Sequence, residues 1–421
     1  MLHAKRRMTA AAASLALGFA ALAAAAPAEA ATKTLTIWAD EQRGPVLKAL
    51  LVGKNPVPGY KIVVKTFSSL DALNTAWNAA TKATGPDVIF SNAGLAASGG
   101  KSGKLVALTL PASVKSQFGS KAFTALSYKG KSYGMPIDVD TTALFWNKKL
   151  FGAKAPTTLT QMVNWYKNNK ASKGLTGGVC ISDSVWGSQS IITAMGGSAW
   201  KYDRAGNPVP NSTAINSAAF KSNFTKLFLG NDGKSNGFYQ QNGECKADFI
   251  AGKIAFINTG GWNYGDIEAA KINAGVTAMP GMKAGTYGSP WTGFQAVYVS
   301  RYAKDNGKLA GAMSFAVRYM GSAAVQASLG AAGNRPPANL AAAKRMNDPV
   351  LAGLALAGSR GVLQLSAMLD DDTAGSNWYG IVPDAFNKIL VDGDPVGATL
   401  DTLATKVKQN FVAGATDAGI I

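Results

Sequence analysis

Strand-like and helix-like segments alternate near the start of this 421-residue chain, and their order restricts the fold strongly. Residues 34–39 alternate in the manner of a strand, residues 46–51 carry apolar side chains at helical spacing, and residues 60–67 again resemble a strand. Residues 70–80 repeat with helical period up to a Gly-Pro stop, and residues 87–90 form a short apolar strand. This order predicts an α/β fold with a largely parallel sheet.

The later part of the chain continues the mixed pattern. Three further strands are expected at 254–258, 275–279 and 295–300. The helices expected here lie at 309–320, 383–391 and 396–411. We find neither an internal repeat nor a low-complexity linker, so two lobes joined by short crossovers suit this length better than two separate domains.

The first 30 residues have the features of a secretory signal peptide. A basic start (Lys5, Arg6, Arg7) precedes an alanine-rich apolar stretch, and Ala28-Glu29-Ala30 supplies a small-x-small cleavage site. The alternative is a first transmembrane helix, which the weak apolar character of alanine and the cleavage signature disfavour. No cysteine stands at the cleavage site, so a lipid anchor there is not indicated. We therefore expect an exported protein, periplasmic or extracellular, that is soluble after cleavage.

Several classes of chemistry lack the residues they need. The one histidine, His3, lies in the leader, so the mature chain has no Ser-His-Asp or Cys-His catalysis and no histidine-ligated zinc. Two cysteines cannot form a cysteine-only metal site, and we predict neither a metal nor a cofactor. In an exported protein, Cys180 and Cys245 are expected to form a disulfide, the alternative being two separate buried thiols.

Eleven short segments, in order along the mature chain, resemble the maltose/maltodextrin-type extracellular solute-binding proteins of ABC sugar importers. The segments are 35–38 (LTIW), 85–90 (GPDVIF), 102–105 (SGKL), 128–131 (YKGK), 135–137 (MPI), 144–148 (LFWNK), 196–197 (GG), 251–256 (AGKIAF), 261–262 (GW), 275–280 (GVTAMP) and 378–379 (WY). No single segment is diagnostic, but together they cover essentially the whole mature chain.

The resemblance implies a type II periplasmic-binding-protein fold, with a ligand cleft between two lobes joined by a three-segment hinge. The N-lobe would comprise 31–138 and 297–343, and the C-lobe 143–290 and 350–421. The hinge crossovers would lie at 139–142, 291–296 and 344–349. Proteins of this family capture an oligosaccharide in the cleft and deliver it to the membrane permease subunits of an ABC transporter, and we expect a monomer.

The resemblance also places three tryptophans, Trp186, Trp262 and Trp378, at positions where the family stacks aromatic rings on sugar. Each stands in a polar, glycine- or serine-containing segment, and Trp262 directly follows a predicted strand. Aromatic rings stack on the C–H faces of sugars, and the hydroxyl rim needs polar partners. For each tryptophan the alternative is an ordinary core or surface position.

The polar positions implied by the resemblance are Asp40, Glu41, Arg43, Asn92, Asp140 and Asp183. Arg43 aligns with a family lysine that bonds sugar hydroxyls, and Asp140 with a family glutamate at the first crossover. The chain departs from the family at 91–95 (SNAGL), where an aromatic residue and an acid–base pair are missing and Asn92 is the only long polar side chain. An oligosaccharide ligand is therefore predicted without maltose being specified.

Some features of the sequence are also compatible with functions other than oligosaccharide capture. A different sugar or another small neutral solute is the first alternative, and a carbohydrate-active enzyme using Asp138 and Asp140 is the second. The excess of 42 Lys and Arg over 24 Asp and Glu gives a net charge of +18, which raises the possibility of nucleic-acid binding. The lysines are scattered singly, however, whereas a nucleic-acid site gathers basic residues on one face, so we expect no nucleic-acid partner.

Overall fold

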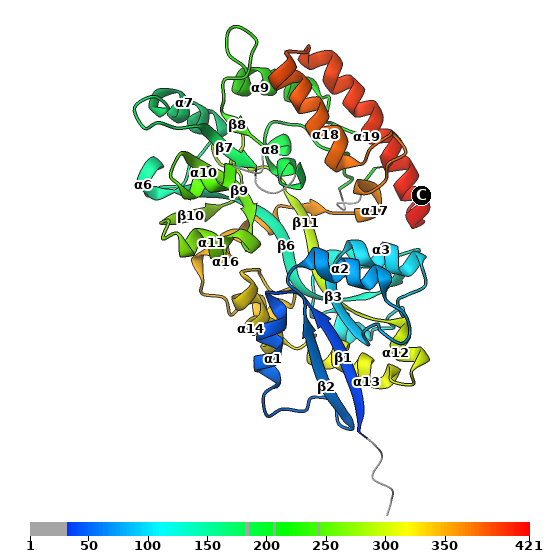
Figure 1. The fold of residues 1–421 in the computed structure, drawn as a ribbon. Helices are drawn as coiled ribbons and strands as arrows, with labels where there is room; N and C mark the ends of the chain where they lie inside the picture. The colour runs from blue at the N-terminus through cyan, green and yellow to red at the C-terminus, as the bar shows by residue number, and fades with distance from the viewer. Residues whose placement is uncertain (1–31, 182–184, 205–207, 210, 242–244) are drawn as a thin grey trace, which may run out of the picture.

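The computed structural model describes residues 32–181, 185–204, 208–209, 211–241 and 245–421. It has two lobes, here called the N-lobe and the C-lobe, with strands β6 and β11 running between them (Figure 1). The predicted signal peptide and Asp183 lie outside the described residues. Within those residues, we find no helix that combines the length and the apolar character needed to cross a bilayer.

The N-lobe contains the alternating segments with which the chain begins, and they fold as predicted. Strand β1 pairs in parallel with β2 and with β3, and β11 joins β3 in antiparallel orientation. The strands are β1 (Lys33–Ala39), β2 (Tyr60–Thr66), β3 (Val88–Asn92), β4 (Ser127–Tyr128) and β5 (Lys131–Ser132). The helices are α1 (Arg43–Leu51), α2 (Leu70–Ala79), α3 (Gly94–Lys101), α4 (Ala112–Lys115), α5 (Ser120–Ala125), α12 (Arg301–Asp305), α13 (Leu309–Met313), η3 (Ser314–Tyr319), α14 (Ala323–Gly333) and α15 (Leu340–Ala343).

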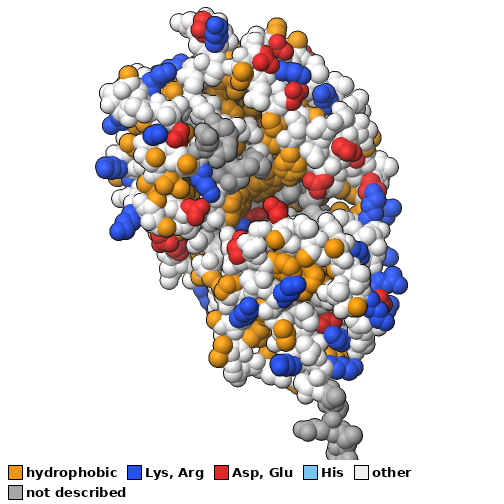
Figure 2. Space-filling model, in the orientation of Figure 1, with side chains coloured by type: hydrophobic (Ala, Val, Ile, Leu, Met, Phe, Trp, Pro, Cys, Tyr) orange, Lys and Arg blue, Asp and Glu red, His pale blue; other side chains and the backbone are white. Residues whose placement is uncertain are grey.

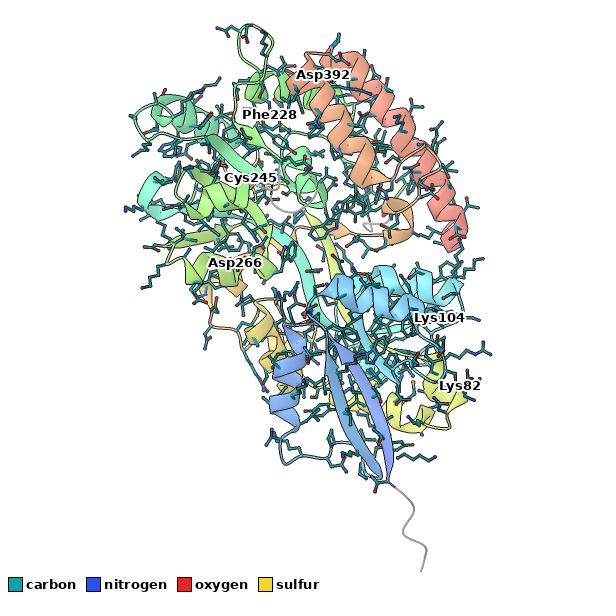
Figure 3. The ribbon with its side chains drawn as sticks, in the orientation of Figure 1. Lys82, Lys104, Phe228, Cys245, Asp266 and Asp392 are labelled. Carbon is teal, nitrogen blue, oxygen red and sulfur yellow. A yellow bond between two sulfur atoms is a disulfide. The ribbon has the colours of Figure 1, made fainter. Side chains whose placement is uncertain are left out.

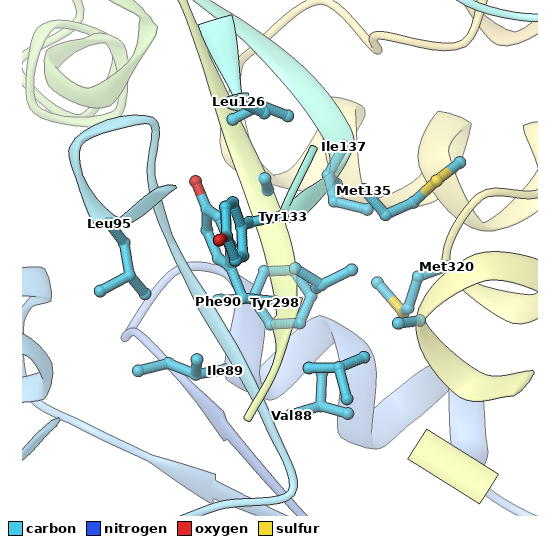
Figure 4. Packing of buried hydrophobic residues seen from close by; sticks show 14 of the residues in the cluster. Val88, Ile89, Phe90, Leu95, Leu126, Tyr133, Met135, Ile137, Tyr298 and Met320 are labelled. Atoms are coloured by element: carbon cyan, nitrogen blue, oxygen red, sulfur yellow. The ribbon is translucent and has the colours of Figure 1, made fainter. Parts of the chain in front are cut away.

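The N-lobe core forms where the sheet meets these helices (Figure 4). Val88, Ile89 and Phe90 of β3 are buried on both faces of the sheet, so this strand has a continuous apolar run instead of an alternation. Met135 and Ile137 belong to the same apolar cluster, which fixes the first half of β6 in the N-lobe.

The C-lobe is built around a second group of strands. Strand β7 lies between β8 and β9 in parallel pairings, and β9 pairs with β6 in antiparallel orientation. The strands are β7 (Gly177–Ile181), β8 (Tyr239–Gln240), β9 (Ile254–Gly260) and β10 (Ala274–Thr277). The helices are α6 (Lys148–Phe151), α7 (Leu159–Asn169), η1 (Val185–Gly187), α8 (Ser188–Ala194), α9 (Ala218–Phe228), α10 (Cys245–Ile250), η2 (Gly261–Asn263), α11 (Tyr264–Ala269), α16 (Pro349–Ser359), α17 (Ser366–Leu369), α18 (Trp378–Asn387), η4 (Lys388–Asp392) and α19 (Val396–Ala418).

Strand β6 (Gly134–Asn147) belongs to both lobes. Its residues Gly134 to Thr141 pair with β11 (Trp291–Val299), and from Thr142 onward it pairs with β9. The short strand β12 (Val362–Leu363) adds to β11. The change of partner falls within the first predicted crossover, and β11 contains the second. The lobe boundaries themselves stay predictions.

Two predicted helices differ from the observed ones. Helix α18 begins at Trp378 instead of Pro383, because the Asn377 side chain accepts a hydrogen bond from the Tyr379 N–H (3.1 Å) and caps the helix earlier. The helix expected at 309–320 is α-helical over its first part and continues as the π-helical η3. Both differences concern local hydrogen bonding and leave the element order unchanged.

The predicted disulfide is present. Cys180 of β7 and Cys245 of α10 are bonded, with their Cα atoms 5.5 Å apart and a sequence separation of 65. Cys245 lies well inside the C-lobe, on the opposite side from the outer helices α18 and α19 (Figure 3). Because Cys245 is the first residue of α10, the bond attaches the start of this helix to strand β7.

We expect the double variant Cys180→Ser, Cys245→Ser to lose roughly 4 kcal/mol of unfolding free energy, because the reduced unfolded chain regains the entropy of a loop of about 65 residues. Urea denaturation followed by circular dichroism measures this loss. Wild-type protein unfolded in reducing buffer should match the variant. Equal midpoints for the oxidised wild type and the variant would contradict a stabilising role.

Candidate binding cleft

A cleft of about 490 Å³ lies between the two lobes. Both lobes and the strands between them contribute to its lining, as a ligand-binding cleft requires. The described lining residues are Asp40, Glu41, Gln42, Arg43, Leu70, Asp71, Asn92, Gly94, Asp140, Trp186, Trp262, Gln295, Arg335, Gln364, Ser366, Asp370 and Tyr379. Figure 2 shows acidic side chains at this hollow, while basic side chains and further acidic ones are spread over the outside.

A second hollow, of about 340 Å³, lies between α18 and the start of α19. It is lined by the C-lobe alone and its described lining includes no aromatic side chain. The interlobe cleft combines aromatic rings, charged groups and two lobes, so it is the candidate site.

Arg43 is at the centre of a buried ion-pair cluster at the floor of the cleft. Its guanidinium group pairs with Asp40 on one side and with the Oδ2 atom of Asp138 at 3.3 Å on the other, and all three residues are at most 2% exposed. Asp40 also accepts the Arg43 N–H (2.9 Å), which fixes the turn between β1 and α1. The cluster therefore connects the first loop of the N-lobe to the shared strand β6.

The pKa values of the two carboxylates in this cluster are shifted in opposite directions. Burial raises the pKa of Asp138, and the nearby Arg43 does not fully offset this effect. Burial also acts on Asp40, but its charge interaction and hydrogen bonds with Arg43 outweigh it and lower the pKa of Asp40. Asp138 and Asp40 together raise the pKa of Arg43 against the effect of its own burial.

A second ion pair lies beside the first. Arg335 donates from Nε to the Oδ1 atom of Asp140 (3.0 Å) and from Nη1 to the Gln42 side chain (2.6 Å). Gln295 of β11 donates to the other Asp140 oxygen at 2.8 Å. Asp138 and Asp140 are two residues apart on β6, so their side chains lie on the same face of the strand. Asp138 pairs with Arg43, and Asp140 pairs with Arg335. Both cleft arginines are thereby neutralised by carboxylates of the protein.

Trp186 and Trp262 form an aromatic surface on the C-lobe side. Their ring centroids are 5.9 Å apart with planes at 57°, and both rings are half-buried. A Cβ atom on Gly260 would lie 1.9 Å from the Trp262 ring, and one on Gly261 would lie 1.7 Å from the Asn334 carbonyl oxygen. These two glycines therefore allow the ring to lie back over the end of β9 and to approach the segment that carries Arg335.

Asn258 fixes the position of the segment η1, which carries Trp186. This fully buried side chain of β9 donates to the Gly187 carbonyl oxygen at 2.6 Å, which ties η1 to the sheet. The guanidinium carbon of Arg335 lies 5.5 Å from the centre of the Trp262 ring, in cation–π contact. The aromatic surface and the charged floor are thus directly connected.

Trp378 does not reach the cleft. It is 2% exposed and packs edge-on against Trp291, at 6.0 Å between ring centroids, within the C-lobe core. The reason is the cap at Asn377, which makes Trp378 the first helical residue and directs its ring inward. The neighbouring Tyr379 lines the cleft instead. The polar sequence around Trp378 suggested a loop, whereas it contains a helix N-cap.

The other predicted polar residues are brought together. Asp40, Glu41, Arg43, Asn92 and Asp140 all line the cleft. Asn92 is half-buried, and its side-chain oxygen accepts the Gly94 N–H at 3.0 Å, capping the turn into α3.

Sequence reasoning missed several lining residues, namely Asp71, Gln295, Arg335, Gln364, Ser366, Asp370 and Tyr379. Two of these residues stand in unusual local sequence contexts. Arg335 stands between a left-handed Asn334, which ends α14, and two prolines that cannot continue the helix. Asp370 begins the only run of three acids in the chain. The others become neighbours only through the tertiary fold.

The polar side chains of the candidate cleft are held in place by neighbouring residues of the protein. Among the residues described, we find no group of three or more His, Cys, Asp or Glu side chains arranged to hold a metal ion. Asp138 is 1% exposed and ion-paired, and Asp140 is held by Arg335 and Gln295. The arrangement suits the recognition of a polar ligand with at least one flat apolar face.

Comparison with known proteins agrees with this geometry. Residues 55–353 match the family described as bacterial extracellular solute-binding protein. The chain belongs to this family. Within it, the chain is 26% identical over 315 residues to a galactooligosaccharide-binding protein of Bacillus subtilis (strain 168), covering 71% of this chain and 72% of that protein.

Two further relatives have related names. The chain is 24% identical over 315 residues to a maltodextrin-binding protein of Bacillus subtilis (strain 168), covering 70% of this chain and 72% of that protein. It is 24% identical over 278 residues to a maltooligosaccharide ABC transporter solute-binding lipoprotein of Streptococcus pneumoniae (strain ATCC BAA-255 / R6), covering 65% of each chain.

Replacing Arg43 by Met should lower the free energy of unfolding by roughly 3–5 kcal/mol, because Asp40 and Asp138 would stay buried without their cation. Chemical denaturation measures the loss. Lys101→Met is the matched control, since its pair with Asp417 has a 63% exposed lysine and the loss of such a hydrated pair should change stability little. Equal losses in the two variants would contradict the central role of the buried cluster.

Asp370→Asn should stabilise the protein at neutral pH more than in acid. The surrounding protein hinders hydration of the carboxylate and raises its pKa from 3.8 to about 6. The charged form is thus disfavoured in the folded state, so the wild type loses stability as the pH rises through about 6. The melting temperature of the variant relative to wild type, followed from pH 4 to 8, should rise up to a pH slightly above 6 and then level off. A pH-independent difference would show that Asp370 titrates normally.

Proposed function

We propose that this chain is an exported substrate-binding protein that captures an oligosaccharide in the interlobe cleft and delivers it to an ABC transporter. The observation that carries this proposal is the pairing of Trp186 and Trp262, opposite a floor of carboxylates and guanidinium groups, in an interlobe cleft. A sugar ring has apolar C–H faces and a hydroxyl rim, and this cleft offers a partner for each.

The size of the cleft supports a short oligomer. A volume of about 490 Å³ falls in the usual range for small-ligand sites, and the two rings provide more stacking surface than one sugar unit needs. The names of the relatives include galactooligosaccharides and maltodextrins, which differ in the configuration of the sugar. The proposal therefore specifies an oligosaccharide and leaves the sugar open.

Delivery requires a membrane partner. The relative from Streptococcus pneumoniae is named as a component of an ABC transporter, and by analogy we assign permease subunits as the partner of this chain. A monomer with a closing cleft is the simplest working unit for such delivery. The predicted leader over residues 1–30 places it outside the cytoplasm, soluble after cleavage.

The alternative of a carbohydrate-active enzyme has less support. A glycosidase needs two carboxyl groups that flank the substrate, one of them protonated and accessible. The pKa of Asp138 is raised by burial, but the same burial separates its carboxylate from the cleft. Asp140 is ion-paired with Arg335 and lacks an accessible acid partner on β6. We therefore propose binding without catalysis.

A thermal-shift screen of neutral oligosaccharides tests the proposed function. At least one trisaccharide of the glucan, galactan or xylan type should raise the melting temperature in a concentration-dependent manner, because a ligand that binds only the folded state stabilises it. Incubation with the same sugars should release no shorter product. If no saccharide of any class shifts the melting temperature, the proposed function is wrong.

Trp262→Ala and Trp186→Ala should each weaken binding of the best ligand roughly 5- to 100-fold, because each removes an apolar contact of about 1–3 kcal/mol. Titration calorimetry measures the change. Trp165→Ala is the control, since this half-buried tryptophan of α7 packs on Phe151 and Phe256, away from the cleft lining. Trp378→Phe should lower stability and leave affinity within about twofold. An equal loss of affinity in Trp165→Ala and Trp262→Ala would contradict the stacking role.

A further inference from the structure

Acidic side chains in the N-lobe are concentrated at the cleft. Over residues 32–138 and 297–343 the sequence has six acids, of which Asp40, Glu41 and Asp71 line the cleft and Asp138 lies directly behind it. Asp87 is buried against Lys308. This leaves Asp305 as the one acid on the remaining surface of the N-lobe. The cleft is therefore acidic in a chain whose net charge is +18.

The positive groups of the cleft are already neutralised. Five carboxylates and two guanidinium groups line its described part, and no lysine does. Arg43 is paired with Asp40 and Asp138, and Arg335 with Asp140. These arginines therefore cannot compensate the other carboxylates of the cleft.

Three lining carboxylates, Glu41, Asp71 and Asp370, have no ion pair or hydrogen bond from their side chains to any described residue. They come from three different elements: the loop after β1, the first turn of α2, and the end of α17. The Oδ2 atom of Asp370 lies 3.9 Å from where a Cβ atom on Gly94 would be, so this carboxylate faces the N-lobe. The unpaired negative charges thus face the cleft from more than one side.

From these observations we propose that the oligosaccharide captured by this protein carries protonated amino groups, as oligomers of an amino sugar do. The assignment rests on the proposed function, because the sugar rings would still stack on Trp186 and Trp262. The ammonium groups would pair with the free carboxylates. An ammonium group donates three hydrogen bonds and has no acceptor, so it matches a site that offers unpaired acceptor oxygens.

Electrostatics favours this ligand over a neutral one. When a ligand fills the cleft, it displaces water from the three carboxylates, and removing water from an unpaired charge is costly. A neutral sugar can donate hydroxyl hydrogens but leaves the mutual repulsion of the carboxylates in place, whereas an ammonium ion offsets both effects. The lysines on the outer surface do not prevent this, because salt screens their charge beyond roughly 8–10 Å.

The test compares two β-1,4-linked trimers that differ by one group on each ring, the glucosamine trimer with its amines and cellotriose with hydroxyls. Calorimetry on the mature protein should give at least tenfold (about 1.4 kcal/mol) tighter binding of the aminated trimer near pH 6, where its amines are protonated and Asp370, with a pKa of about 6, is half ionised. The preference should fall as salt increases from about 0.05 to 0.3 M.

Variants locate the effect within the cleft. Glu41→Gln and Asp71→Asn should each reduce the ratio of the two affinities at least threefold, while Asp305→Asn, which removes an exposed carboxylate outside the cleft, should leave the ratio unchanged. If Asp305→Asn lowers the ratio as much as the cleft variants do, the preference comes from overall charge and the proposal is wrong.

The choice of ligands distinguishes a failure of the amino-sugar assignment from a failure of the proposed function. Equal or tighter binding of cellotriose or maltotriose overturns the amino-sugar assignment and leaves sugar capture standing. Spermidine, which carries amines without sugar rings, should bind more weakly than the aminated trimer. If spermidine binds more tightly and no saccharide binds, both the amino-sugar assignment and the proposed function fail.

Discussion

A single strand shared by two sheets determines the geometry of this protein. Strand β6 pairs with β11 in the N-lobe up to Thr141 and with β9 in the C-lobe from Thr142. Because side chains alternate along a strand, Asp138 and Asp140 extend from the same face of β6, close to where the partner changes. Each then pairs with an arginine from a different loop, Arg43 after β1 and Arg335 after α14. The floor of the cleft is thus attached to the strand that pairs in both lobes.

The N-lobe fold could be predicted because it depends on local order along the chain. The resemblance to the family indicated Arg43 and Asp140, whereas Arg335 on the same floor was missed. Alternating segments revealed the N-lobe, and Arg43 and Trp262 stand directly after strands, where α/β proteins place binding residues. Trp378 was misjudged because a polar segment can form either a loop or a helix cap, and here Asn377 caps α18 and directs the tryptophan into the core. Asp71 and Asp370 could not be found in this way, since α2 and α17 become neighbours of the cleft only in three dimensions.

The net charge of the chain and the charge of the cleft lining differ in sign. A net charge of +18 with few acids suggested an anionic partner, yet most of the N-lobe acids lie in or just behind the cleft. The excess of lysine belongs to the outer surface, where charges are hydrated and screened and contribute little to ligand choice. The composition of the whole chain therefore does not describe the charge of the cleft, whose described lining has five carboxylates, two arginines and no lysine.

The charged groups of the cleft divide into two sets with different physical roles. The carboxylates of Asp40, Asp138 and Asp140 are committed to Arg43 and Arg335, so they fix the floor and change little when a ligand arrives. Glu41, Asp71 and Asp370 have no such partner, so their interaction energy is available to the ligand alone. A rigid, internally neutralised floor reduces the cost of ordering the site on binding. Selection among ligands of similar shape then depends on the unpaired set, since a ligand that leaves these carboxylates uncompensated loses affinity to one that does not.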